Sequence, residues 1–149
     1  MKLEEEIAST NFDDDYHKTV VNVIFTYGWV INLLRKCFDK HEVTMQQFNV
    51  LRILRGQYPQ PATINLLKER MLDKMSDASR IVDRLLQKGL VSRCINGRDK
   101  RAVDIEINEK GLELLKIIDQ EMHIHDVLKT HLSEEEAAQL NMLLDKLRG

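Results

Sequence analysis

Several residue types are scarce in this 149-residue chain, and the scarcity of cysteine and of long apolar runs excludes whole classes of protein. There are two cysteines, two prolines, six glycines and 5% aromatic residues. Cys37 and Cys94 fall in different predicted elements, so the sequence holds no disulfide framework of the kind that stabilises small secreted domains. No apolar run is long enough to span a bilayer, and the acidic segment 1–6 lacks the apolar core of a signal peptide. We therefore expect a cytoplasmic protein without a membrane partner.

Residue patterns that carry chemistry are also scarce. The sequence has no Gly-rich phosphate loop, no Ser-His-Asp arrangement and no recognisable carboxylate dyad, so we expect neither enzyme activity nor a cofactor. His123 and His125 lie on different sides of a predicted helix, and His131 lies two helical turns beyond His123. Because no cysteine or carboxylate completes a short-range tetrahedral set around them, we predict no metal site. Exposed or interfacial histidines are the simpler interpretation.

Charged residues, by contrast, make up 31% of the chain and form an informative pattern between residues 73 and 111. Apolar residues recur there at spacings of three and four, which predicts a helix with one buried face. That face consists of Ala78, Ile81, Val82 and Leu85. The polar side carries Ser76, Arg80, Asp83 and Gln87, with Asp77 and Arg84 at its edge. Such a side suits a helix that enters the major groove of DNA, with phosphates attracted to the helix N-terminus, although a solvated face explains the same pattern.

A β-hairpin is predicted directly after this helix. Gly89 stands where a helix ends in a left-handed residue, and Asn96-Gly97 is a strong turn signal between strands at 90–95 and 102–107. In the second strand Val103, Ile105 and Ile107 alternate with Asp104 and Glu106, which predicts one packed face and one wet face. The tip carries Arg98, Asp99, Lys100 and Arg101. Three cations on so short a loop suit a narrow minor groove, whereas a hairpin kept soluble by its charges is the alternative.

A helix with exposed arginines followed by a cationic hairpin predicts a winged helix-turn-helix that binds double-stranded DNA. The fold class expected is therefore mainly α with a small β-hairpin. Residues 63–108 hold ten Lys and Arg against seven Asp and Glu, a balance of +3, while the rest of the chain has −5. The positive charge is thus concentrated in the segment that would meet phosphates, even though the whole chain has a net charge of −2.

These motifs together resemble the MarR (multiple antibiotic resistance regulator) family of transcription factors. The resemblance is carried by Asp83-Arg84-Leu85, Lys88-Gly89-Leu90-Val91, Arg98-Asp99-Lys100-Arg101 with Val103, and Glu109-Lys110-Gly111. It extends over nearly the whole chain and is weakest before Tyr16. It implies that Arg101 enters the minor groove and that Asp99 holds the wing by ion pairing. The DNA-binding residues that we predict are Ser76, Asp77, Ser79, Arg80, Arg84, Arg98, Lys100 and Arg101.

The helix before the recognition helix departs from the family pattern. The family usually has a Leu-Ala pair and a turn of the Leu-Gly-Leu-Ser kind, whereas this chain has Leu67-Lys68 and Met71-Leu72-Asp73-Lys74. Lys68 stands where a small residue normally lets the two helices approach, and no glycine opens the turn. The angle between the helices therefore depends on whether the Lys68 side chain extends past the contact.

The helices at the two chain ends predict a dimer. Residues 16–40 predict a long helix that is apolar around much of its circumference, and 109–131 predict a second long helix. The last helix has a leucine stripe made of Leu140, Leu143, Leu144 and Leu147. We predict side-chain caps at Thr44, Thr63, Asn108 and Ser133. Because such stripes have few partners within the chain, we expect a two-fold homodimer, which the resemblance also implies. The expected division is dimerisation helices at 1–42 and 111–149 around a DNA-binding domain at 43–110.

The function expected is sequence-specific transcriptional regulation, as a repressor of nearby genes on a near-palindromic operator with half-sites about 34 Å apart. The alternative is a winged-helix module that binds protein and does not recognise DNA. The discriminating feature is the set of cations on both the helix and the tip, namely Arg80, Arg84 and Arg101, which a protein-binding wing does not need.

The resemblance also implies a small aromatic or phenolic effector, bound between the dimer helices and the DNA-binding domain. No motif identifies its site. Tyr27, Trp29, Phe38 and Phe48 are possible lining residues, and ordinary core packing explains them equally well. Some members of the family sense oxidants through a cysteine near the start of the first long helix. Neither Cys37 nor Cys94 matches that position, so buried, unreactive cysteines are the simpler interpretation.

Overall fold

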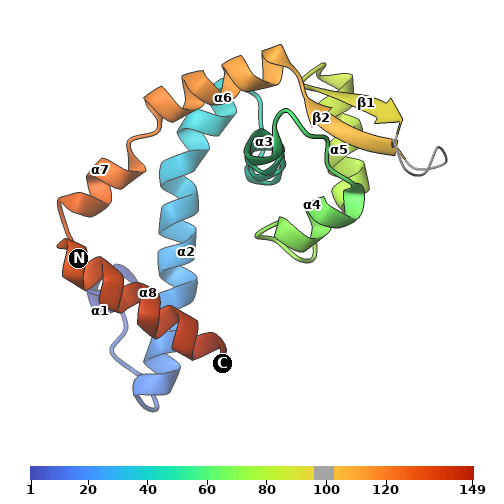
Figure 1. Cartoon of the computed structure of the whole chain (residues 1–149). Helices are drawn as coiled ribbons and strands as arrows, with labels where there is room; N and C mark the ends of the chain where they lie inside the picture. Colours follow the sequence, from blue (N-terminus) through green and yellow to red (C-terminus); the bar gives the residue numbers. More distant parts are fainter. Residues whose placement is uncertain (96–102) are drawn as a thin grey trace. The chain divides into compact units, whose positions relative to one another are not determined.

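Helices make up most of the part of the chain that the computed structural model describes, residues 1–95 and 103–149 (Figure 1). The elements are α1 (Leu3–Glu6), α2 (Asp15–Lys40), α3 (Met45–Gln57), α4 (Ile64–Arg70), α5 (Ala78–Gln87), β1 (Val91–Ile95), β2 (Val103–Ile107), α6 (Glu109–Glu121), α7 (Ile124–Lys129) and α8 (Glu134–Arg148). Helices with a single antiparallel hairpin after α5 confirm the predicted fold class. The chain divides into two units, Met1–Lys36 and Cys37–Gly149.

The first unit contains α1 and most of α2. Lys18 of α2 binds Glu4 of α1, with 2.5 Å between Nζ and Oε1, so the N-terminal arm is attached to the long helix. Large apolar side chains remain exposed along α2: Val20, Ile24 and Tyr27 keep 56%, 66% and 68% of their surface. A helix that exposes this much apolar surface has the composition of an interface.

The core of the second unit lies among α3, α4, α5, α6 and the hairpin. The members of the helical core with at most 2% exposure include Val50, Leu51, Leu54, Leu67, Ala78, Val82 and Leu85. Backbone N–H groups of Gln47, Leu66, Gly111 and Glu136 donate to the side chains of Thr44, Thr63, Asn108 and Ser133. All four predicted caps are therefore confirmed, and three of them fix the starts of helices that surround this core.

The hairpin pairs β1 with β2 in antiparallel register, from Val91 opposite Ile107 to Ile95 opposite Val103. It lies next to α5 (Figure 1). The segment before α4 adds a bridge that we do not predict from the sequence: Ala62 and Ile105 exchange two backbone hydrogen bonds of 2.8 Å. This bridge anchors β2 on its second edge and ties the hairpin to the start of the helix-turn-helix.

The predicted alternation of β2 is only partly right. Ile105 and Ile107 are buried, but Val103 keeps 49% of its surface, and Asp104, predicted to be wet, is 7% exposed. Val103 pairs with Ile95, which is 77% exposed, so both lie at the far end of the hairpin beyond the core. The predicted Asn96-Gly97 turn lies outside the described residues.

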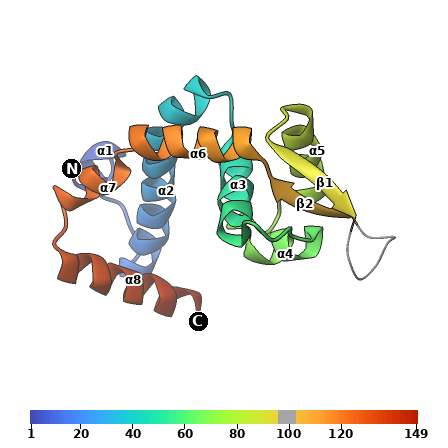
Figure 2. The same cartoon turned by 45° about the horizontal axis from the view of Figure 1, so that its top comes forward.

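The prediction of one helix over 109–131 is wrong. α6 ends at Glu121, Met122 adopts an extended conformation with ψ 94°, and α7 begins at Ile124 (Figure 2). Neither glycine nor proline marks this break, but His123, Ile124, His125 and Asp126 are all weak helix formers, so the sequence offers little resistance to it. No helix in the described part of the chain combines the length and apolar character needed to cross a membrane.

Candidate nucleic-acid interface

α5 presents the two arginines that the sequence singles out. Ala78 and Leu85 are fully buried, which fixes the rotation of the helix about its axis. Arg80 and Arg84, on the other side, are both exposed. They lie four residues apart and therefore one above the other on the helix surface. Ser79 is exposed next to them, so this face offers two guanidinium groups and a short hydroxyl.

The start of α5 differs from the prediction. Ser76 precedes the helix, and Asp77 caps it by accepting hydrogen bonds from the backbone N–H groups of Ser79 and Arg80, at 3.0 and 3.2 Å. Neither residue therefore belongs to the outer helical face where the spacing puts them. Because a carboxylate already occupies the positive end of the helix dipole, the N-terminus of α5 is a poor site for a phosphate.

A groove of about 340 Å³ lies where α5 meets the N-terminus of α3. Its lining comprises Thr44, Gln46, Gln47, Ser76, Asp77, Arg80, Ile81 and Arg84. Four of the five described candidate residues thus meet at one surface, and Ser79 lies outside this lining. The sequence interpretation missed Gln46, although the capping box at Thr44 and Gln47 marks the α3 N-terminus that positions it.

The turn between α4 and α5 needs no glycine because Asp73 organises it. The Asp73 carboxylate accepts from the backbone N–H of Met75 at 3.0 Å and from the hydroxyl of Ser76 at 2.6 Å. The Ser76 hydroxyl, followed by the Met75 N–H, holds the pKa of Asp73 below its ordinary value. Lys68 is exposed while Leu67 is buried, so the longer side chain extends past the helix contact. The departure from the family pattern is therefore accommodated at the surface.

The junction between α5 and the hairpin is fixed by polar contacts. Gly89 has φ +67°, which confirms the predicted left-handed residue after the helix. Its carbonyl accepts from the Asn108 amide at 2.9 Å. The Lys88 ammonium donates to the carbonyl of Glu42 and to Gln47 Oε1, the latter at 3.2 Å. These contacts join the end of α5 to the starts of α3 and α6.

Gly111, in the first turn of α6, lies where the hairpin leaves no space for a side chain. A Cβ at this position would lie 2.3 Å from the carbonyl oxygen of Leu90 and 2.7 Å from Ile107 Cγ1. No side chain fits, so glycine is what allows α6 to approach both strands closely.

The described base of the wing carries one ion pair with the recognition helix. Arg93 of β1 and Asp83 of α5 lie 2.7 Å apart, nitrogen to oxygen. This pair occupies Asp83 and leaves Arg80 and Arg84 as the cations of the α5 face. The candidates at the wing tip, which are Arg98, Asp99, Lys100 and Arg101, lie outside the described residues.

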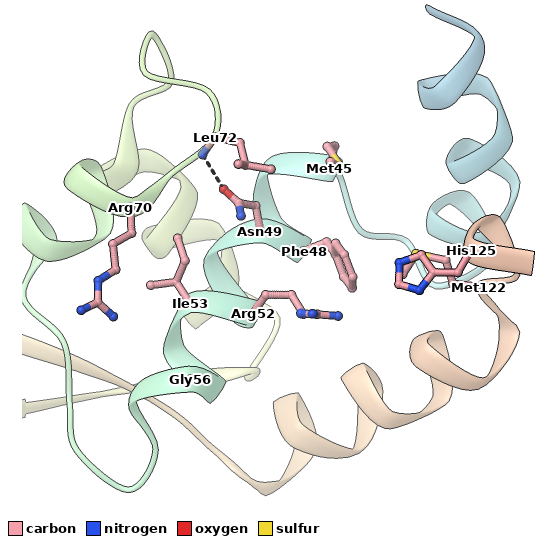
Figure 3. A pocket seen from close by; sticks show the side chains of 10 residues that line it. All are labelled: Met45, Phe48, Asn49, Arg52, Ile53, Gly56, Arg70, Leu72, Met122 and His125. Carbon is pink, nitrogen blue, oxygen red and sulfur yellow. Dashed lines mark hydrogen bonds between the residues drawn. The ribbon is translucent and has the colours of Figure 1, made fainter. Parts of the chain in front are cut away.

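A second pocket, of about 500 Å³, opens on the other side of α3. Its lining comprises Met45, Phe48, Asn49, Arg52, Ile53, Gly56, Arg70, Leu72, Met122 and His125. Phe48 and Arg52 point from α3 towards Met122 and His125 (Figure 3). Of the aromatic residues proposed for effector binding, Phe48 lines this pocket, while Phe38 is buried against Phe48 with 4.9 Å between ring centroids.

The two thiols are not activated. Burial raises the pKa of Cys37 and of Cys94, and neighbouring carboxylates act in the same direction. Since the thiolate is the reactive form, burial disfavours the reactive state of both cysteines, and at Cys37 only Lys40 acts in the opposite direction. Cys37 nevertheless lies close to His41 and Glu121, a set of possible metal ligands.

The chain resembles known proteins over most of its length. Residues 43–103 match the MarR family profile. The multiple antibiotic resistance protein MarR of Salmonella typhimurium is 30% identical over 117 residues, which cover 77% of this chain and 80% of that protein. The chain belongs to the MarR family. The HTH-type transcriptional regulator MhqR of Bacillus subtilis is 29% identical over 81% of this chain and 83% of its own length. Among solved structures, a mutant MarR from E. coli complexed with operator DNA is 26% identical, with a TM-score of 0.72 and 99% of both chains covered.

Membership of the MarR family confirms the interpretation drawn from the helix and hairpin motifs. This protein is a DNA-binding transcriptional regulator, and the alternative of a pure protein-interaction module is not favoured. The relative MhqR is itself a transcriptional regulator.

Proposed function

We propose that this MarR-family protein binds a near-palindromic operator as a homodimer and represses nearby genes until a small effector releases it. The observation that carries the proposal is the pair Arg80 and Arg84, which are both exposed on one face of α5. The opposite face of α5 is buried and fixes the orientation of the helix. Guanidinium groups at this spacing suit guanine edges and phosphates in the major groove. Ser79 would approach the sugar-phosphate backbone of the DNA, whereas Ser76 and Asp77 form the start of α5.

The wing supplies the second set of contacts in this proposal. Arg98, Lys100 and Arg101 would meet the minor groove or its phosphates, and Asp99 would hold the wing by ion pairing. These roles rest on the wing motif in the sequence. Arg93, exposed at the base of the wing and already paired with Asp83, extends the same cationic surface towards the tip.

The dimer is proposed from the helices at the two chain ends, 1–42 and 111–149, with 43–110 as the DNA-binding domain. The apolar stripes on α2 and α8 support this division because their side chains are exposed within a single chain. Two copies of α5 related by a two-fold axis would contact successive major grooves, about 34 Å apart. A cytoplasmic location is part of the same proposal, because the protein must reach chromosomal DNA.

The effector proposed is a small aromatic acid or phenol, and the 500 Å³ pocket is its site. The volume is typical of small-molecule sites. Phe48 and Leu72 offer apolar contacts. Arg70 offers a cation to an anionic group, and Arg52, which also pairs with Asp119 at 3.1 Å, offers a second. Leu72 N–H donates to Asn49 Oδ1 at 2.9 Å, and Leu72 directly precedes the Asp73 turn. A ligand that displaces this contact would therefore shift the turn that positions α5. Because such a ligand would bind the shifted conformation more tightly, it would weaken DNA binding.

The test of DNA recognition is binding of the purified protein to the DNA upstream of its own gene, across a range of salt concentrations, beside a scrambled duplex. We expect a two-fold footprint and a steep fall of affinity with salt. Arg80→Ala and Arg84→Ala should each weaken binding by about 1–3 kcal/mol. The matched control is Lys116→Ala, which removes one cation from the exposed side of α6. Equal binding to both duplexes, or equal losses in all three variants, would contradict the proposal.

A further inference from the structure

Two helix ends in the second unit bring three possible metal ligands together. Cys37 lies in the last turn of α2, His41 follows the end of that helix, and Glu121 is the last residue of α6. One ligand atom from each, Cys37 Sγ, a ring nitrogen of His41 and a carboxylate oxygen of Glu121, all lie within 4.8 Å of one another. His41 Nε2 already contacts Glu121 Oε2 at 2.8 Å. The cluster joins residues 80 positions apart in sequence, which is why the spacing of the histidines did not reveal it.

The three side chains have the donors that one class of metal ion prefers. Thiolate sulfur, imidazole nitrogen and carboxylate oxygen are the ligands of Zn²⁺, and three protein ligands with a water in the fourth position form an open tetrahedral site. We propose that Cys37, His41 and Glu121 form a binding site for a zinc-type divalent cation. This inference rests on residues of the second unit alone and does not depend on the proposed operator or effector.

The geometry requires a modest contraction. With metal–ligand distances of about 2.0–2.3 Å, tetrahedral donors lie roughly 3.3–3.8 Å apart. The present limit of 4.8 Å leaves on the order of 1 Å to close, which side-chain rotation can supply. All three residues are partly buried, so the ion would be shielded on its protein side and would keep a position open to solvent.

Lys40 is a cationic neighbour of the proposed site through Glu121. Its ammonium lies 2.5 Å from Glu121 Oε1, so the carboxylate already has one cationic neighbour. A carboxylate ligand must be ionised, and the Lys40 ammonium and the His41 ring that contact Glu121 both favour its ionised form. When the metal binds, Cys37 releases its thiol proton to solvent and the sulfur takes the bond to the metal. The ion would compete with Lys40 for Glu121.

Binding would fix the joint between α6 and α7. Glu121 directly precedes the break at Met122, and Met122 lines the 500 Å³ pocket. A metal at Glu121 would connect this joint to the end of α2. The site would thus restrict the same segment that closes one side of the pocket.

The test uses Co²⁺ as the probe on the reduced, full-length protein. We expect one Co²⁺ per chain, with the visible bands of tetrahedral cobalt and a thiolate-to-cobalt charge-transfer band, and displacement of both by Zn²⁺. Cys37→Ser should abolish the charge-transfer band, and His41→Gln and Glu121→Gln should weaken binding by at least about tenfold, as losses around metal sites do. Circular dichroism establishes that each variant is folded.

Three controls separate this site from ordinary cobalt binding. Cys94→Ser and His123→Gln remove a thiol and an imidazole elsewhere and should leave the spectrum and affinity unchanged. Lys40→Met keeps every ligand, removes the competing ammonium and should tighten cobalt binding. Cobalt bound without a charge-transfer band, an unchanged band in Cys37→Ser, or equal or weaker binding in Lys40→Met would each overturn the proposal.

Discussion

The winged-helix region (residues 43–110) buries its leucines, whereas the helices at the two chain ends leave apolar residues of the same type exposed. In the winged-helix region Leu51, Leu67 and Leu85 have no exposed surface. In α8 no residue is buried, and Leu143 and Leu147 keep 58% and 55% of their surface. α2 has a similar exposed stripe in its first half.

This contrast shows that helix formation and burial are separate requirements. α8 has a complete capping box at Ser133 and a regular leucine stripe, and its local signals are as good as those of α3. What it lacks within one chain is a surface to cover that stripe. An apolar stripe stabilises a helix only where another surface buries it. The stability of the terminal helices should therefore depend on a second copy of the chain.

The largest expected effect comes from charging the α8 stripe. Leu143→Glu should convert the proposed dimer to monomers, because a carboxylate cannot be buried in an apolar interface without a partner. Affinity for a full near-palindromic operator should then fall by on the order of 10³-fold, since the second half-site is no longer tethered. Sedimentation velocity and titration of labelled operator measure the two losses.

Ala138→Glu is the matched control for this variant, because Ala138 is exposed on the opposite side of α8. It should leave both the dimer and its affinity unchanged. The comparison between the two regions fails if Leu143→Glu stays dimeric, or if its monomers bind the full operator as tightly as the parent protein.

The next largest effect is expected inside the winged-helix region and its junction with α6. Gly111→Ala forces a methyl group against the Leu90 carbonyl and Ile107, and should lower the free energy of unfolding by about 3 kcal/mol. Gly56→Ala in α3 is the control, because a Cβ there meets nothing within 4 Å and alanine favours a helix. Denaturation in urea measures the free energy of unfolding of both variants. If Gly111→Ala were as stable as the parent protein, α6 would not approach Leu90 and Ile107 this closely.

A smaller loss is expected at the polar contacts of the same region. Lys88→Met removes the hydrogen bonds from the ammonium to the Glu42 carbonyl and to Gln47, and should cost about 1–2 kcal/mol. Gln47 is 3% exposed, so its side chain would lose a partner that water replaces poorly. Lys116→Met, at an exposed position on α6, should change the unfolding free energy little. Equal stability of the two variants would mean that packing alone holds α5 against α3.

The elements that the sequence predicts correctly are those whose signal is local. The buried face of α5, the four caps and the left-handed Gly89 each depend on residues within about one helical turn. All are confirmed except that Ile81, predicted on the buried face, is only half-buried. The family motifs are local in the same sense, because they span the end of α5 and the hairpin.

The features that sequence reasoning missed depend on contacts between distant segments. The Ala62 bridge to β2 joins residues 43 positions apart, and no periodicity in either segment indicates it. The Cys37, His41 and Glu121 cluster depends on where α6 ends, and that end has no glycine or proline to mark it. The Asp73 turn is a local feature that the sequence motifs did not predict, because it is formed by side-chain hydrogen bonds of an aspartate and not by a glycine.

The smallest effect expected is a pH dependence of that turn. Because hydrogen bonds from Ser76 and Met75 hold the pKa of Asp73 below its ordinary value, its contribution to stability is present above the unfolded pKa of about 4 and is lost as pH falls through the folded value. Asp73→Asn should therefore melt at a lower temperature than the parent near neutral pH, and the difference should shrink on the acid side of pH 4, roughly.

Comparing the parent and Asp73→Asn at each pH cancels the acid sensitivity of other carboxylates, Glu121 among them, because both proteins contain them. Ser76→Ala removes the first cause of the lowered pKa and should reduce the pH-dependent part of the difference without removing the Met75 contact. A difference between parent and Asp73→Asn that stays constant from neutral to acid pH would show that the turn depends on shape alone. A difference that shrinks in acid would show that a charge-assisted hydrogen bond holds the turn that positions α5.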